Sequence, residues 1–141
     1  MTHEFFIRLQ IPTMTQQEHK ITTRGGKPRL YEPAELKAAR LKLRDHLAQH
    51  RPERPLVGPL SLSTVWGFYA GDKHAEGEWK TTPPDTDNLV KMLKDEMTRL
   101  HFWTDDAQVC AERIVKSYSN TAVGLYVCIA ELEGENEPEC E

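Results

Sequence analysis

The chain has 141 residues, of which 38% are hydrophobic and 28% charged, as is typical of one compact globular domain. Its mean hydropathy of −0.62 excludes an apolar run long enough to span a membrane. The formal net charge of −4 gives no general attraction to nucleic acid, but six of the acidic residues lie among the last eleven positions.

The two ends of the chain and its cysteines indicate no catalytic or metal site. Residues 1–8 lack the basic region and long apolar stretch of a secretory signal, so we expect a cytoplasmic protein. The three cysteines include no C-x-x-C pair, which predicts reduced thiols rather than a disulfide framework or a zinc site. Residues 133–141 are rich in glutamate and are expected to be disordered, which leaves residues 1–132 as a single domain.

The first third of the chain predicts a strand, a loop and a helix. Residues 4–11 carry large apolar side chains before Pro12, which is typical of a strand. Residues 12–32 are polar and contain the sequence Arg-Gly-Gly-Lys-Pro-Arg, so we expect a long exposed loop of the kind that often carries function. From residue 33 to about residue 49, leucine and alanine recur at helical spacing, which predicts a helix.

The middle of the chain predicts a second strand and a second helix. Residues 60–69 alternate between large apolar side chains and smaller or polar ones, as expected of a half-buried strand. A polar loop follows at residues 71–84 and ends in two prolines, which no helix or central strand tolerates. Residues 87–100 then place four apolar side chains on one helical face.

Two further strands complete the predicted fold. Residues 107–118 and 121–132 are strand-like, and Ser119-Asn120 between them is a candidate two-residue hairpin turn. The element order is then β-α-β-α-β-β. It predicts an α+β fold in which a small mixed β-sheet has helices packed on one face.

Positive charge is concentrated between residues 20 and 54, where ten Lys and Arg residues stand against four acidic ones. Such an excess favours phosphate binding, although a solvated loop and helix surface is the commoner explanation for a charge run. The first helix places its basic side chains together at the edge of its apolar stripe. The DNA-binding candidates here and in the loop at 71–84 are Arg24, Lys27, Arg29, Lys37, Arg40, Arg44, Lys73 and Lys80.

Carboxylates stand at both ends of the second helix. Asp85 and Asp87 precede it, and Asp105-Asp106 stand at the entrance of the next strand, so we expect them to converge. Carboxylate oxygens suit Mg²⁺, which keeps open positions for a phosphate oxygen and an attacking water. Lys91 lies one helical turn after Asp87, where an ammonium can meet charge on a scissile phosphate. The alternative is structural, with Asp87 as an N-cap and Asp87–Lys91 as a surface ion pair.

The run from Asp85 to Lys91 reads Asp-Thr-Asp-Asn-Leu-Val-Lys, and Asp95 follows it. Residues 102–109 then read Phe-Trp-Thr-Asp-Asp-Ala-Gln-Val, and Val-Lys stands at 115–116. This pattern closely resembles that of the RusA-type Holliday-junction resolvases. The resemblance implies a small α+β homodimer that binds four-way or other branched DNA. It also implies hydrolysis of phosphodiesters in two opposed strands with Mg²⁺, or alternatively Mn²⁺, as cofactor.

The resemblance also implies roles for individual residues. Asp85, Asp87 and Asp106 would be the metal ligands and Lys91 the catalytic lysine. Asn88 would support these ligands, and Asp105 is the weaker ligand candidate. Two segments depart from the family pattern, because prolines stand directly before Asp85 and residues 12–17 replace an asparagine-bearing segment. No DNA contact is therefore carried over to either segment.

Three functions fit the sequence. The first is a Mg²⁺-dependent, structure-selective endonuclease that resolves Holliday junctions by paired phosphodiester hydrolysis. The second is a catalytically inactive module that binds branched DNA, and the changed residues before Asp85 motivate it. The third is a small-molecule phosphoesterase, which the acidic total charge motivates. The order follows from the residues, because the third leaves the basic region without a purpose and the second leaves the carboxylates with little.

Overall fold

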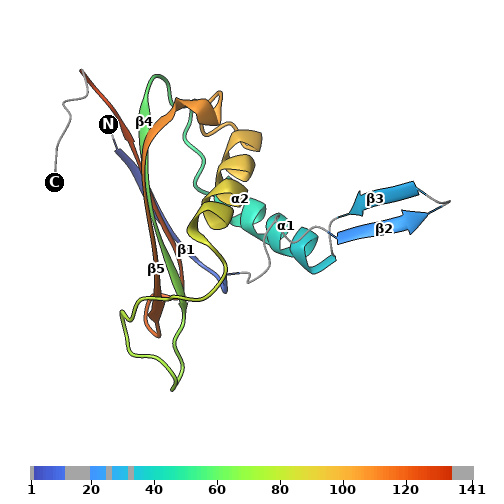
Figure 1. Ribbon diagram of the computed structural model, residues 1–141. Coiled ribbons are helices and arrows are strands. Elements are labelled where there is room, and N and C mark those ends of the chain that lie inside the picture. The colour runs from blue at the N-terminus through green and yellow to red at the C-terminus, as the bar shows by residue number, and fades with distance from the viewer. Residues whose placement is uncertain (1, 12–19, 25–26, 32–33, 135–141) are drawn as a thin grey trace.

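The computed structural model describes residues 2–11, 20–24, 27–31 and 34–134 (Figure 1). Its elements in chain order are β1 (Thr2–Arg8), β2 (Lys20–Arg24), β3 (Lys27–Tyr31), α1 (Ala34–Ala48), β4 (Leu60–Tyr69), α2 (Thr86–Arg99), the 3₁₀ turn η2 (Asp106–Gln108), β5 (Val109–Ser119) and β6 (Gly124–Glu131).

The main sheet has four strands in the order β1-β6-β4-β5. Strand β4 runs parallel to β5 and antiparallel to β6, so the sheet is mixed. Strand β6 also pairs antiparallel with β1, from Thr2 opposite Ala130 to Arg8 opposite Gly124. Both helices pack on one face of this sheet (Figure 1). The predicted α+β class, the mixed sheet and the helices on one face are confirmed, and the main sheet with its two helices has the predicted order β-α-β-α-β-β.

The core lies between this face of the sheet and the two helices. Alternate positions of β4 and β6 are buried, as their apolar periodicity predicts, and each helix buries one stripe of apolar side chains. Burying each large side chain contributes about 1.5–3 kcal/mol to the stability of the fold. These contacts hold α2 against the sheet. The central buried side chains are Leu60, Leu62, Trp66, Leu125, Val127, Ile129, Leu36, Leu43, Leu47, Leu89, Leu93 and Met97.

A two-stranded ribbon replaces much of the long loop expected at residues 12–32. Strands β2 and β3 pair antiparallel, from Lys20 opposite Tyr31 to Arg24 opposite Lys27. The ribbon projects away from the main sheet (Figure 1). The expectation of a loop is therefore wrong for these strands, while residues 12–19 lie outside the described part. Two strand-forming runs on either side of Gly-Gly were the available signal.

The predicted hairpin turn at Ser119-Asn120 is also wrong, because β5 and β6 are not neighbours in the sheet. Strand β4 lies between them, and the connecting residues cross over its end. A Cβ atom at Gly67 of β4 would lie 2.2 Å from the carbonyl oxygen of Ala122 in this connection. The crossing therefore requires glycine at position 67.

Several boundaries differ by a few residues from those expected. Strand β1 ends at Arg8 rather than at residue 11, although Leu9 and Ile11 beyond it remain buried. Strand β5 begins at Val109 because η2 occupies the three residues before it. Of the glutamate-rich tail, residues 135–141 lie outside the described part of the chain. Neither described helix combines the length and apolar character that a membrane crossing requires.

Candidate active site

Asp85 and Asp87 stand at the N-terminus of α2, and both are exposed. Asp85 occupies the N-cap position with extended backbone angles, φ −72° and ψ 152°, but its side chain makes no capping hydrogen bond. An N-cap aspartate ordinarily accepts a hydrogen bond from the first turn, so the oxygens of Asp85 are directed elsewhere. Both carboxylates lie beside the positive end of the helix dipole.

Lys91 lies on α2 one turn after Asp87 and is also exposed. The next lysine, Lys94, is tied to the sheet instead, because its Nζ donates to Oε1 of Glu112 on β5 at 2.5 Å. Asn88 is half-buried beside Asp87. The structure therefore brings Asp85, Asp87 and Lys91 together at one end of α2, as the helical spacing predicts.

Lys116 of β5 holds the segment that leads to Asp85. Its Nζ donates to the carbonyl oxygen of Pro84 at 2.8 Å and to that of Thr82 at 3.0 Å. The peptide bond between Pro83 and Pro84 is cis. Because Pro84 directly precedes Asp85, this lysine holds the backbone that leads to the first carboxylate. Lys116 belongs to the residues that resemble the family, but the sequence analysis gave it no role. The available signal was a lysine that directly follows Ile114 and Val115 in a predicted strand.

Lys80, a predicted DNA contact, points into a cluster of the loop and the sheet. Its Nζ donates to Oγ1 of Thr82 at 2.8 Å and to the hydroxyl of Tyr118 at 3.3 Å. It also lies 4.9 Å from the ring centroid of Phe68 and 5.1 Å from that of Tyr118. The hydrogen bond with Thr82 and the nearby ammonium lower the pKa of Tyr118. Lys73, the other candidate in this loop, is exposed.

Asp105 has a structural partner. Its side chain accepts a hydrogen bond from the backbone N–H of Ala107 at 2.9 Å, and the side chain of Gln108 accepts one from the backbone N–H of Asp105 at 3.0 Å. This reciprocal capping box begins η2. Asp106 is the first residue of η2 and is half-buried. Of the two adjacent aspartates, Asp106 is thus the better candidate for a ligand.

Asp106 lies at the opposite end of α2 from Asp85 and Asp87. The helix has 14 residues, which corresponds to a length of about 21 Å at 1.5 Å per residue. The backbone N–H of Phe102 donates to the carbonyl of Met97 at 3.0 Å, so the chain is still beside the C-terminal end of α2 shortly before Asp106. It then enters β5 at the end of the sheet farther from the start of α2 (Figure 1).

The expected convergence of carboxylates is therefore not found within one chain. Among residues 2–11, 20–24, 27–31 and 34–134, no three His, Cys, Asp or Glu side chains are placed to hold one metal ion. The donors themselves still fit a hard cation, since all are carboxylate oxygens and the pair at the start of α2 is exposed. The described part of one chain thus places two carboxylates at the start of α2, with Asp106 apart from them.

Three of the basic side chains of α1 gather at its border with α2. Arg40 and Arg44 both contact Glu96 of α2, and Lys37 lies one turn before them on the exposed surface. Arg99 of α2 joins this group, although it was not among the sequence-predicted candidates. The predicted DNA contacts Arg24, Lys27 and Arg29 belong to β2 and β3, whose side chains lie outside the described part.

Comparisons with known proteins show which sequences this chain resembles. Residues 10–130 match the family described as Endodeoxyribonuclease RusA. The chain is 33% identical over 111 residues to "Crossover junction endodeoxyribonuclease rusA" of Lactococcus phage r1t, which covers 77% of this chain and 83% of that protein. It is also 33% identical over 107 residues to "Uncharacterized protein YqaN" of Bacillus subtilis (strain 168), which covers 68% of this chain and 75% of that protein.

Proposed function

The chain belongs to the RusA endodeoxyribonuclease family, and from this membership we propose that it resolves Holliday junctions by Mg²⁺-dependent, paired phosphodiester hydrolysis. The observation that carries the proposal is the start of α2, where Asp85, Asp87 and Lys91 are presented together to solvent. Two carboxylates and an ammonium one turn apart are the groups that metal-assisted phosphoryl chemistry needs.

Each of these side chains would have a distinct task. Asp85, Asp87 and Asp106 would hold Mg²⁺, with Asn88 supporting them. When bound, the metal supplies an activated water and neutralises charge on the phosphate. The ammonium of Lys91 would stabilise the negative charge that develops at the reacting phosphate. Lys116 would act through position, because it fixes the carbonyl of Pro84 immediately before Asp85.

The separation of the carboxylates supports a homodimer with composite sites. Mg–O distances of about 2.1 Å require all ligand oxygens to lie within about 4 Å of one another. One chain places Asp106 a full helix length away from Asp85 and Asp87. A two-fold axis that sets the two α2 helices antiparallel would bring the start of one helix near the end of the other. Asp85 and Asp87 of one subunit would then share a metal with Asp106 of the partner subunit.

A two-fold dimer also matches the substrate class. A four-way junction offers two equivalent strands, and a symmetric protein offers two equivalent sites for paired cuts. The positive charge on α1 and Arg99 would hold the phosphate backbone. Each subunit would therefore contribute to both cuts.

The test of this function is cleavage of a synthetic four-way junction beside a linear duplex of matching sequence, with Mg²⁺ and with EDTA. We expect paired nicks in the junction alone and only with the metal. Asp87→Asn should abolish these nicks and keep junction binding, because it removes a ligand charge from an exposed position. Asp72→Asn, an exposed aspartate of the loop before α2, serves as the matched control and should cleave normally. Cleavage retained in Asp87→Asn would reject the assignment.

A second candidate is a branched-DNA binding module without catalytic activity. The two prolines directly before Asp85, where the family often has a basic residue, favour it. Tight junction binding without nicks in either Mg²⁺ or Mn²⁺ would support this candidate over the nuclease. Absence of any salt-dependent DNA binding would instead favour a small-molecule phosphoesterase.

A further inference from the structure

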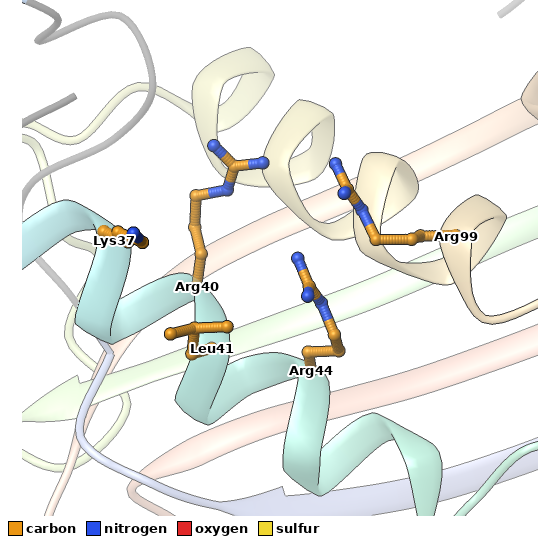
Figure 2. Close-up of a pocket in the computed structure, with 5 residues that line it drawn as sticks. All are labelled: Lys37, Arg40, Leu41, Arg44 and Arg99. Carbon is orange, nitrogen blue, oxygen red and sulfur yellow. The ribbon is translucent and has the colours of Figure 1, made fainter. Parts of the chain in front are cut away.

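A basic pocket lies between α1 and α2, away from the start of α2. It has a volume of about 280 Å³ and is lined by Lys37, Arg40, Leu41, Arg44 and Arg99. The guanidinium groups of Arg40 and Arg44 reach from α1 toward α2, and that of Arg99 extends from α2 on the same side (Figure 2). None of the described residues that line this pocket is acidic.

Beneath the pocket, Glu96 of α2 holds the arginines in place. Its side chain is fully buried, and its Oε2 accepts from Nε of Arg44 at 2.6 Å. Its Oε1 accepts from Nη2 of Arg40 at 3.3 Å, and Nε of Arg99 lies 3.8 Å from Oε2. Glu96 thus contacts all three guanidinium groups, and the ammonium of Lys37 lines the same pocket.

This arrangement suits a phosphate group. Arginine presents a rigid planar fork that pairs with two phosphate oxygens at once, and several arginines side by side multiply such bonds. Side chains already ordered by a buried partner lose less conformational entropy when they bind a ligand. Arg99, whose side chain is 56% exposed, has the widest access to solvent of the three arginines.

We propose that this pocket is a phosphate-binding site and that it holds a phosphate of the DNA backbone in the complex. The assignment to DNA rests on the proposed function, whereas the affinity for phosphate does not. Arg99 lies twelve residues after Asp87, about 18 Å along the helix axis. The pocket therefore binds a phosphate other than the one that Asp87 and Lys91 of the same chain contact.

The variants that test the pocket must leave Glu96 paired. Changing Arg44 would remove the shortest bond of a buried carboxylate, so a loss of binding could not be told from a loss of folding. Lys37→Gln with Arg99→Gln removes two pocket charges at exposed positions. Lys42→Gln with Arg54→Gln removes the same two residue types at exposed positions that do not line the pocket, and is the matched control.

The first measurement is a titration of the full chain with inorganic phosphate, followed by ¹H–¹⁵N spectra of the arginine side chains. Sodium chloride at equal ionic strength is the reference. We expect saturable shifts of the Arg40, Arg44 and Arg99 Nε–H signals in the wild type and in the control. In the pocket variant the phosphate affinity should fall at least about tenfold, because two charge-assisted contacts are lost.

The second measurement is fluorescence anisotropy of a labelled four-way junction in EDTA over a series of salt concentrations. The pocket variant should bind about tenfold more weakly, with a salt dependence reduced by about one phosphate contact. The control should lose less than about threefold.

The outcomes separate this proposal from the proposed function. Selective loss in the pocket variant in both measurements supports it. Phosphate shifts with equal DNA affinity in the two variants would assign the pocket to a free anion and overturn the DNA assignment. Absence of phosphate shifts, with equal DNA affinity in the two variants, would overturn the proposal entirely. A wild type that fails to bind the junction would reject the nuclease function, while the phosphate titration would still decide the pocket.

Discussion

A single buried carboxylate, Glu96, links the two helices that carry the candidate sites. Among the described residues it is the one charged side chain that the core encloses completely. Glu96→Gln should lower the free energy of unfolding by about 1–3 kcal/mol, since the bonds to Arg40 and Arg44 lose their ionic character. Urea denaturation measures the change, and Glu53→Gln at an exposed position should leave the midpoint unaltered. Equal midpoints for both variants would contradict this role of Glu96.

Ionised Glu76 accepts hydrogen bonds from the connection between β5 and β6. Its Oε1 accepts from the backbone N–H of Asn120 at 3.0 Å and of Thr121 at 3.2 Å. Hydrogen bonds with the side chain of Ser119 and with these groups lower the pKa of Glu76 from its ordinary value of 4.5. Because the pKa is lower in the folded state, ionised Glu76 stabilises the fold above that ordinary value. This contribution is lost as the pH falls through the lowered value.

Glu76→Gln should therefore flatten the dependence of stability on pH under acidic conditions. The measurement is the urea midpoint of both proteins between about pH 3 and pH 6. The two curves should differ most at the upper end of this range and approach each other at the lower end. A constant difference at every pH would mean that the charge of Glu76 is not what stabilises the connection.

At the scale of elements, the crossing of β4 by the β5–β6 connection depends on Gly67. A Cβ atom there would lie 2.2 Å from a backbone oxygen, which cannot move without shifting the connection. Gly67→Ala should reduce the free energy of unfolding by about 2–4 kcal/mol. Gly58 has a φ of +71° but open space around it, so Gly58→Ala should cost about 1–2 kcal/mol. Thermal denaturation compares the two, and equal losses would argue against the steric explanation.

Elements with a clear periodicity could be predicted from the sequence alone. Strand β4 and both helices carry their apolar residues at the spacing of the buried face, so their bounds were found within two residues. Which strands pair is not encoded locally. Ser119-Asn120 suits a hairpin turn, yet β5 and β6 lie on opposite sides of β4. The ribbon of β2 and β3 was missed because its polar composition resembles that of a loop.

In the candidate site, too, local spacing could be predicted from the sequence and tertiary placement could not. The spacing of Asp87 and Lys91 on one helix predicts their proximity directly. The place of Asp106 depends on the length and direction of α2 relative to the sheet, which no local pattern reveals. Lys116 and Arg99 acquire their roles through tertiary contacts, with Pro84 and Glu96 respectively.

At the scale of the whole molecule, the proposed composite site predicts complementation between two inactive variants. Asp87→Asn and Asp106→Asn should each abolish nicking alone. Mixed dimers would contain one site with both changes and one site with none, so refolding an equal mixture should restore about a quarter of the wild-type nicking. A mixture of Asp85→Asn and Asp87→Asn is the control. Both changes then lie at the same end of α2, and every site keeps a defect.

The gel assay on a four-way junction measures this recovery. Recovery only in the first mixture would support sites shared between subunits. Failure of both mixtures, with mixed dimers demonstrated by a size-tagged subunit, would place each complete site within one chain and overturn the composite arrangement.

The pairing of β1 with β6 has a consequence for synthesis of the protein. Arg8 lies opposite Gly124. Strand β1 therefore cannot begin to pair with β6 until 116 further residues have been translated. At 5–20 residues per second this delay lasts about 6–23 seconds. Throughout it, Phe5 and Ile7 lack the strand beside which they are buried, and a chaperone has time to bind them. A chain interrupted before β6 lacks the strand that joins β1 to β4, so it cannot complete the main sheet.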